Sequence, residues 1–205
     1  MWHLFMKVLL STCILLLLLS GCFGPVLRKV EDPSKPIVRP LYSVFPPAGD
    51  GWMYLQDDLP DDRHVIMFSK IISRTHSIVA TIMEVKAGPR PSTPQKFLEM
   101  IESELNKEDS SDSERYKEKS NTIVLNNRFG PYTVRVGSQY KDYGAVNRGD
   151  TPFLVFVGYS YYFFHPSEAF ILVTMDYSER GKAEEMSKNL EHDAEEFYRH
   201  ISLAQ

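Results

Sequence analysis

The sequence predicts an α+β fold in which an antiparallel sheet of about six to eight strands is flanked by two main helices. Seven or eight short segments are rich in β-branched and aromatic residues, and turn residues separate most of them. Two other segments, 94–105 and 182–202, repeat apolar residues every three or four positions. Because these helical patterns stand apart from the hairpin-like strands, we expect layered α+β packing.

The amino-terminal residues have the pattern of an export signal. Lys7 precedes the apolar run Val8–Leu19, and the small residues Ser20 and Gly21 stand directly before Cys22. A transmembrane helix needs roughly 20 apolar residues, which this run does not supply. An ordinary cleaved signal more often ends in an Ala-x-Ala pattern, which is absent here.

Leu19-Ser20-Gly21-Cys22 resembles the lipobox of bacterial lipoproteins. The resemblance implies that residues 1–21 are a lipoprotein signal peptide, cleaved between Gly21 and Cys22. It also implies that Cys22 carries an S-diacylglyceryl group and an N-acyl group such as palmitate, which anchor the exported protein in a membrane. In enterobacterial lipoproteins, Asp after the cysteine signals retention at the inner membrane. Phe23 stands there instead, which favours the outer membrane if the organism is Gram-negative.

Composition narrows the classes of function. The 205 residues contain 23 Lys and Arg against 27 Asp and Glu, a net charge of −4, and this mild acidity argues against a nucleic-acid partner. The two cysteines are Cys13, inside the signal peptide, and Cys22. We therefore expect a folded domain with no disulfide, no thiolate nucleophile and no cysteine metal site.

Residues 22–40 are predicted to form the lipidated cysteine and a proline-rich tether. Pro25, Pro33, Pro36 and Pro40 exclude a helix interior and favour extended polyproline II. At about 3.1 Å per residue, such a tether would hold the domain up to roughly 55 Å from the bilayer. A short edge strand near Ile37-Val38 is expected within it, and residues 41–205 are expected to form a single α+β domain.

Eight segments of this domain are predicted strands. Phe153–Phe164 is the longest apolar run and is expected to be a central strand, paired with 169–177 across the turn His165–Glu168. The stretch Ser73–His76 suits a hairpin connection, and a charged, serine-rich loop is expected over Lys107–Lys119. The predicted strands are 42–45, 52–55, 65–70, 77–85, 122–125, 132–140, 153–164 and 169–177.

Two helices complete the predicted domain. Thr93 is expected to cap the first helix, with Pro94 at its first position. The last helix is expected to run from about Lys182 to Ser202, and both helices should turn an apolar stripe to the core. The stripe residues are Phe97, Leu98, Ile101 and Leu105 in the first helix and Ala183, Met186, Leu190, Ala194, Phe197 and Ile201 in the last.

Candidate chemical sites are few. The acidic stretch Asp57–Asp62 offers calcium ligands, but its proline and the lack of an EF-hand glycine favour a solvated turn. His192 with Glu195 or Glu196 could place two metal ligands on one helical turn, but no third ligand is evident and an exposed helix face is favoured. Gly158-Tyr159-Ser160-Tyr161 lacks the second glycine of a nucleophile elbow. We predict no catalytic residue, no metal, no cofactor and no enzymatic activity.

Aromatic residues suggest a binding surface. Tyr159, Tyr161, Phe163 and Tyr177 alternate along the two predicted central strands, and Trp52 lies at a turn. One sheet face could therefore carry a hydrophobic groove for a lipid or a peptide. The competing interpretation, which we favour, is that one of the two helices covers this face.

The order of elements over residues 41–203 resembles the Mog1/PsbP-like fold, an antiparallel sheet sandwiched by helices. The points of similarity are Phe45-Pro46-Pro47 before Gly51-Trp52, the Thr93-Pro94 helix start, and His165-Pro166 before a strand ending in Tyr177-Ser178-Glu179-Arg180-Gly181. The chain is similar to small, uncharacterised proteobacterial lipoproteins of this fold. The resemblance implies no catalytic residues, and the membrane partners of photosystem subunits with this fold are an analogy only.

We therefore expect a lipid-anchored cell-envelope protein of unknown molecular role, acting as a protein-interaction module that faces the periplasm or the cell surface. Its expected partners are the membrane, through the Cys22 lipid anchor, and an envelope protein. No nucleic-acid partner is expected. The alternative is a carrier or chaperone that holds a lipid or peptide in an aromatic groove. A third hypothesis, an envelope hydrolase, needs Ser or His gathered with acids in a cleft.

Overall fold

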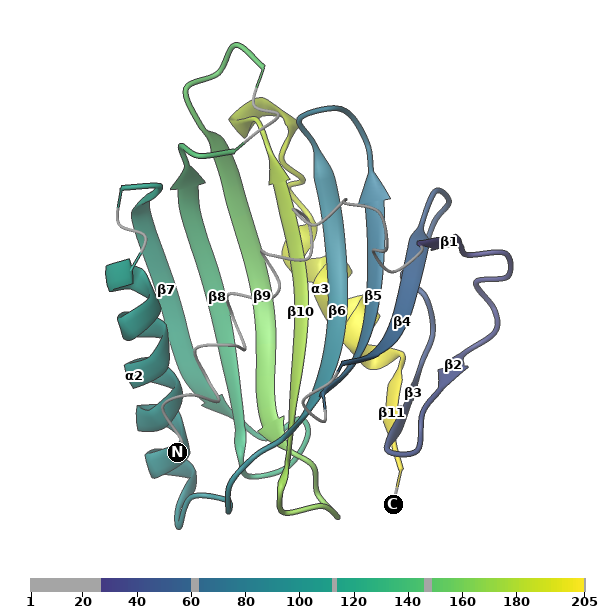
Figure 1. Cartoon of the computed structure of the whole chain (residues 1–205), viewed down its shortest axis with the longest axis vertical. Helices are drawn as coiled ribbons and strands as arrows, with labels where there is room; N and C mark the ends of the chain where they lie inside the picture. The colour runs from purple at the N-terminus through teal and green to yellow at the C-terminus, as the bar shows by residue number, and fades with distance from the viewer. Residues whose placement is uncertain (1–26, 60–62, 112–113, 146–148, 205) are drawn as a thin grey trace.

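The computed structural model describes residues 27–59, 63–111, 114–145 and 149–204 (Figure 1). The predicted signal peptide and Cys22 lie outside the described residues, as do residues 60–62 of the acidic stretch. The described residues form a large antiparallel sheet, a small second sheet and two α-helices, which confirms the predicted α+β class.

An eight-stranded antiparallel sheet is the centre of the fold. Its strands are β1 (Arg28–Lys29), β4 (Met53–Leu59), β5 (Arg63–Ile71), β6 (Ser77–Lys86), β7 (Tyr116–Asn126), β8 (Thr133–Asp142), β9 (Leu154–Phe164) and β10 (Ile171–Gly181). Their spatial order is β1-β4-β5-β6-β10-β9-β8-β7. The chain therefore builds the sheet from one side through β6, crosses to the far edge at β7, and returns inward until β10 pairs with β6. The two strands predicted to be central, β9 and β10, lie inside the sheet as expected.

The first predicted helix is present as α2 (Pro94–Ser111), which lies along the β7 edge and contacts β7 and β8 (Figure 1). Thr93 acts at its start as predicted, because its Oγ1 accepts the backbone N–H of Lys96 at 3.2 Å. The predicted stripe faces the sheet. Phe97, Ile101 and Leu105 are buried against Val134, Val136, Tyr162 and Phe164.

The loop predicted over Lys107–Lys119 is wrong at both ends. α2 continues to Ser111, and β7 begins at Tyr116. Lys107 and Glu108 are good helix formers, and they extend the helix beyond its apolar stripe. Tyr116 is buried and packs its ring on that of Tyr140, with centroids 5.0 Å apart, so one aromatic side chain fixes the start of the strand.

The helix predicted over 182–202 is interrupted. It is replaced by a 3₁₀ turn, η1 (Ala183–Glu185), then α3 (Leu190–Arg199), then the short strand β11 (Ile201–Leu203). Glu179 explains the interruption, because both its carboxylate oxygens accept the backbone N–H of Ser187, at 3.1 and 3.0 Å. This side-chain acceptor fixes the backbone between η1 and α3 in a non-helical conformation.

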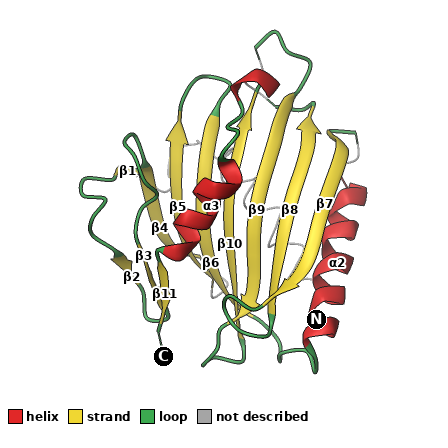
Figure 2. Ribbon diagram, turned by 180° about the vertical axis from the view of Figure 1, so that it is seen from behind, coloured by secondary structure: helices red, strands yellow, loops and turns green. Residues whose placement is uncertain are grey.

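A small sheet joins segments from the two halves of the chain. It contains β2 (Ile37–Val38) and β3 (Tyr42–Val44) beside β11, in the order β11-β3-β2. The edge strand expected at Ile37-Val38 is confirmed. Figure 2 shows α3 lying across one face of the large sheet, with this small sheet next to it.

The described part of the predicted proline-rich tether, residues 27–40, contains the short strands β1 and β2. β1 pairs with β4, and Val30 donates its N–H to the carbonyl of Trp52 at 3.0 Å. Hydrogen bonds hold this segment against the sheets, and Val30 packs on the core. A turn interrupts the segment where Lys35 donates its N–H to the carbonyl of Asp32 at 3.2 Å. The domain therefore begins at β1, and residues 23–27 alone separate it from Cys22.

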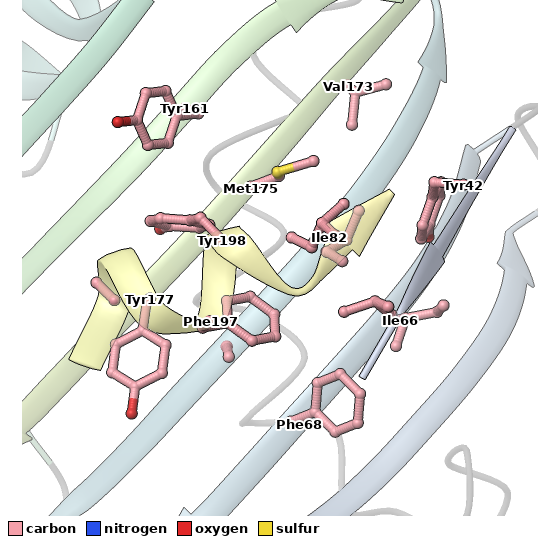
Figure 3. Packing of buried hydrophobic residues seen from close by; sticks show 14 of the residues in the cluster. Tyr42, Ile66, Phe68, Ile82, Tyr161, Val173, Met175, Tyr177, Phe197 and Tyr198 are labelled. Carbon is pink, nitrogen blue, oxygen red and sulfur yellow. The ribbon is translucent and has the colours of Figure 1, made fainter. Parts of the chain in front are cut away.

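The main core lies between the large sheet and the layer formed by α3 and the small sheet. Phe68 packs on Phe197 of α3 with ring centroids 6.1 Å apart, and Tyr161 packs on Tyr198 at 5.1 Å (Figure 3). Adjacent residues of β9 serve opposite faces, as strand geometry requires. Phe163 belongs to this core, whereas Phe164 packs on Phe97 of α2 at 5.3 Å.

Candidate functional site

The described chain enters the fold at one end of the large sheet. Lys29 of β1 lies opposite Met53 of β4, and Met53 lies opposite Ser69 of β5. Ser69 is close to the turn between β5 and β6, so β1 is at the same end of the sheet as this turn (Figure 1). Cys22 lies outside the described residues, but its attachment to the domain is at this end.

Apolar side chains are exposed where β5 ends and the turn to β6 begins. Ile71 is 75% exposed and Ile72 is 49% exposed. The turn itself is ordered by local hydrogen bonds, since the N–H groups of Ile72 and Ser73 both donate to the carbonyl of His76. Ser73 Oγ in turn accepts the N–H groups of Thr75 and His76 at 3.2 and 3.1 Å. The predicted hairpin connection Ser73–His76 is therefore present as a compact turn.

A buried hydrogen-bonded pair of side chains, His76 and Glu179, holds this turn to the carboxyl end of β10. Nε2 of His76 lies 2.5 Å from Oε1 of Glu179, and the two residues are 9% and 1% exposed. Thr75 adds a second link, because its hydroxyl donates to the carboxylate of Glu185 in η1 at 3.0 Å. The sequence identified no partner for His76, and the turn and β10 are far apart in the chain.

A second polar cluster lies between the two sheets near the other end of β6. Glu84 is only 4% exposed, and burial raises the pKa of its carboxyl against the opposing charges of Arg39, His64 and His165. Burial also raises the pKa of the nearby Tyr42 hydroxyl. Of the four buried side-chain polar atoms without a hydrogen-bond partner among the described residues, three belong to this cluster: Arg39 Nε, Tyr42 Oη and Glu84 Oε1.

The residues next to this cluster include Asp57 and Asp58 of the acidic stretch that was considered for calcium. Asp58 accepts a hydrogen bond from Arg39 at 2.7 Å, and its Oδ1 lies 2.7 Å from Nδ1 of His64. Asp57 and Asp58 belong to β4, and Asp57 accepts the N–H of Asp58 at 2.9 Å. In the described ranges, no group of three or more His, Cys, Asp or Glu side chains is placed to hold a metal ion.

The histidine–glutamate pattern on the last helix forms ion pairs instead of a metal site. Glu195 accepts hydrogen bonds from the guanidinium groups of Arg128 and Arg135. Glu196 pairs with Arg199 one turn along the helix, while His192 is exposed. The carboxylates thus fasten α3 to β8 and its preceding turn, in keeping with the helix-face interpretation.

Ser160 is hydrogen-bonded to a carboxylate, but without a histidine. Its hydroxyl donates to Oδ1 of Asp176 at 2.8 Å, and Ser178 donates to Oδ2 of the same side chain at 2.8 Å. Burial raises the pKa of Asp176, and the two hydroxyls oppose this effect. Among the described contacts of this trio there is no imidazole to accept a serine proton, so the geometry of a Ser-His-acid nucleophile is not met.

The aromatic residues proposed for a groove are part of the core. Tyr161, Phe163 and Tyr177 are at most 5% exposed. α3 lies over them, with Tyr177 packed on Phe197 and the Tyr198 hydroxyl donating to the carbonyl of Tyr159. Trp52 packs on Tyr177 and donates its Nε1–H to the carbonyl of Ala48 at 3.0 Å. The covering-helix interpretation is correct, and the predicted aromatic groove is filled by α3.

No described helix has both the length and the apolar content needed to cross a membrane. The residues that sequence reasoning missed are the buried acids Glu84 and Glu179. Each occupies a position in a strand whose alternation points it to the α3 side, where apolar residues are the rule. An acidic residue at an inward-facing position of a predicted strand is the sequence signal that could have identified them.

Comparison with known proteins finds similar solved structures but shows no family for this chain. No family model matches the chain, and no curated protein matches it. The solution structure of cyanobacterial PsbP (CyanoP) from Synechocystis sp. PCC 6803 is similar at 15% identity over 91% of this chain and 99% of that chain, with a TM-score of 0.45. The crystal structure of LpqN, involved in cell envelope biogenesis of Mycobacterium tuberculosis, is similar at 15% identity over 88% and 90%, with a TM-score of 0.46. At these values neither likeness carries an argument about function.

Proposed function

We propose that this chain is an exported lipoprotein, acylated on Cys22, whose α+β domain acts at the cell envelope through protein contacts. The observation that carries the proposal is Leu19-Ser20-Gly21-Cys22, which directly follows the apolar run Val8–Leu19. Small residues before the cysteine leave its thiol accessible, and the thiolate is the strong nucleophile that acylation requires. The remaining 183 residues, 23–205, contain no other cysteine that could compete.

The fold supports a short attachment. Because β1 pairs with β4, the anchor would be separated from the folded domain by residues 23–27 alone. A single acyl chain binds membranes marginally, and two or more make anchoring stable. The domain would therefore remain beside the bilayer, and Phe23 after the cysteine supports the outer membrane in a Gram-negative organism.

Acylation is tested with two cysteine variants of the full chain. Cys22→Ala should abolish both the incorporation of radiolabelled palmitate and the fractionation of the protein with membranes. Cys13→Ala is the matched control, because that thiol lies in the signal peptide, and it should keep full labelling. Retention of the label in Cys22→Ala would refute the proposed acylation of Cys22. Separation of inner and outer membranes on a density gradient would show which membrane holds the labelled protein.

The β7 edge is the surface best suited to a protein contact. β7 is last in the sheet order, and no described strand pairs with its outer side. Val124 and Leu125 on this strand are 42% and 41% exposed. Because α2 lies along this edge, the proposed contact is made through these exposed apolar side chains and not by addition of a strand.

The contact is tested by photo-crosslinking in intact cells. A photoreactive phenylalanine analogue at Leu125 should yield a discrete adduct with an envelope protein. The same analogue at Phe170, which is 57% exposed on the turn between β9 and β10, serves as the control. If both positions give the same adducts, or neither gives any, the β7 edge is not the contact surface.

A further inference from the structure

The end of β5 and the turn that follows it expose two adjacent isoleucines. Lys70 and Ile71 are the last residues of β5, and the turn begins at Ile72. The sequence from Lys70 to His76 places the two isoleucines between two cations and contains no acid. Ile71 is more exposed than any other large apolar residue described, and Ile72 beside it is half exposed. We call residues 70–74 the isoleucine tip.

The isoleucine tip is held in place by hydrogen bonds of the turn residues Ser73, Thr75 and His76. His76 is buried and bonded to Glu179, Thr75 is bonded to Glu185, and Ser73 Oγ accepts two backbone N–H groups. The two isoleucines are therefore presented on a fixed turn and are not free to fold back onto the sheet. A preorganised apolar tip loses little conformational freedom when a partner covers it.

The isoleucine tip is on the same end of the sheet as the point where the chain enters. Ile71 lies two residues beyond Ser69, and Ser69 is joined through Met53 to Lys29 of β1. The chain from Cys22 to Arg28 spans at most about 20 Å when fully extended. An acylated Cys22 would thus keep this end of the domain within reach of the bilayer surface.

The charges around the isoleucine tip suit the interface of a bilayer. Lys70 and Arg74 flank the apolar pair, and long cationic side chains can bury their stems while the charge reaches the headgroups. Lys70 extends over Trp52, with Nζ 5.9 Å from the ring centroid. Glu185, below the turn, is engaged by Thr75 and by the N–H of Lys182. The exposed Asp50 stands between Gly49 and Gly51, the two glycines beside the Lys70 side chain.

From this arrangement we infer that the isoleucine tip inserts into the membrane interface, with Ile71 and Ile72 among the acyl chains and Lys70 and Arg74 at anionic headgroups. The inference rests on the lipid anchor of the proposed function and deepens it. The anchor holds the domain near the bilayer, and the tip fixes its orientation. The exposed side chains Val124 and Leu125 of β7, which is five positions from β5 in the sheet order, are then left accessible to a protein partner.

The test uses the absence of other cysteines in the mature chain. The full lipoprotein with Ile72→Cys is labelled with an NBD fluorophore and reconstituted in vesicles of phosphatidylethanolamine and phosphatidylglycerol. Phe170→Cys is the control, since it lies at the opposite end of β6, about 30 Å away along the strand. NBD at position 72 should shift to the blue and be quenched by brominated lipid, while NBD at position 170 should remain in water.

Matched apolar-to-polar changes then test the tip itself. In the Ile72→Cys protein, Ile71→Asn should reduce quenching by brominated lipid, whereas Val124→Asn on the β7 edge should leave it unchanged. Both positions are exposed, and circular dichroism checks that each variant is folded. Mass spectrometry of the preparation separates the two proposals. If Cys22 is acylated and position 72 still reports water, the inference is overturned and the anchor stands; if Cys22 carries no acyl group, the proposed function fails.

Discussion

Nε2 of His76 lies 2.5 Å from Oε1 of Glu179, and this contact joins the turn after β5 to the carboxyl end of β10. Both side chains are buried, and the remaining acceptor capacity of Glu179 is used by the backbone N–H of Ser187. A single carboxylate therefore orders the isoleucine tip and also divides the last helical segment from η1.

Glu179→Gln should lower the free energy of unfolding by about 2 kcal/mol, because the buried imidazole and the Ser187 N–H lose their charged acceptor. Urea unfolding of the purified protein measures the loss. The control is Glu184→Gln, an exposed acid in η1, which should change stability little. His76→Gln removes the same contact, so the double variant should lose less than the sum of the two single losses. Additive losses would show that the two side chains do not interact.

Glu84→Gln should stabilise the protein at neutral pH. The ordinary pKa of glutamate is near 4.5, and burial raises that of Glu84 in the folded state. As pH rises above 4.5 the unfolded chain ionises first, so Glu84 makes stability fall until its raised folded pKa is passed, and the loss persists above it. Removing this charge should add roughly 1–3 kcal/mol at pH 7.

The advantage of Glu84→Gln should vanish below pH 4, where Glu84 is protonated in both states. Unfolding free energies measured from pH 3 to pH 8 check this dependence. Glu99→Gln, a change at an exposed acid on α2, is the control and should track the wild type at every pH. An advantage that stays constant across the range would mean that ionisation of Glu84 is not its cause.

Phe197→Ala should cost about 3–5 kcal/mol of unfolding free energy, since it removes a buried ring that contacts Phe68 and Tyr177. Calorimetry should show a lower Tm, whereas His192→Ala on the exposed side of the same helix should leave the Tm nearly unchanged. Tyr198→Phe tests the hydroxyl contact with Tyr159 separately, with an expected loss of about 1 kcal/mol. Equal Tm values for Phe197→Ala and His192→Ala would contradict the position of α3 over the sheet.

The amide of Val30 should exchange slowly with solvent, because it donates to the carbonyl of Trp52. Hydrogen exchange followed by NMR or mass spectrometry measures its protection. The amide of Ser34, which is exposed and bonds only to the neighbouring Asp32, should exchange faster. Exchange of Val30 at the rate of an unstructured peptide would restore a free tether in place of β1.

Local signals were sufficient for much of the fold. Thr93 and the stripe from Phe97 to Leu105 predict α2 because a cap and a helical repeat are both encoded within a few residues. The central hairpin is likewise readable from alternating aromatics around one turn. The Ile37-Val38 strand is correct for a similar reason, since two β-branched residues lie between prolines.

The errors share a physical cause, which is that the deciding partner is distant in the chain. The last helix was predicted as continuous because nothing near Ser187 shows that Glu179 will accept its N–H. Tyr116 starts β7 by packing on Tyr140, and β1 exists because β4 offers it an edge. The same cause applies to the candidate site. The acylation of Cys22 is predicted from the residues next to it in the sequence. The isoleucine tip could not be predicted in this way, because its position near the entry of the chain depends on the pairing of β1 with β4.

The pairing of β3 with β11 has a consequence for the order in which the chain folds. Tyr42 pairs with Leu203, so the small sheet cannot close until residues 201–203 have been delivered. Contacts between segments this distant form slowly compared with local ones. A chain that passes through a translocation channel in an unfolded state would be protected from premature closure by this requirement. Folding would then be completed on the far side of the membrane.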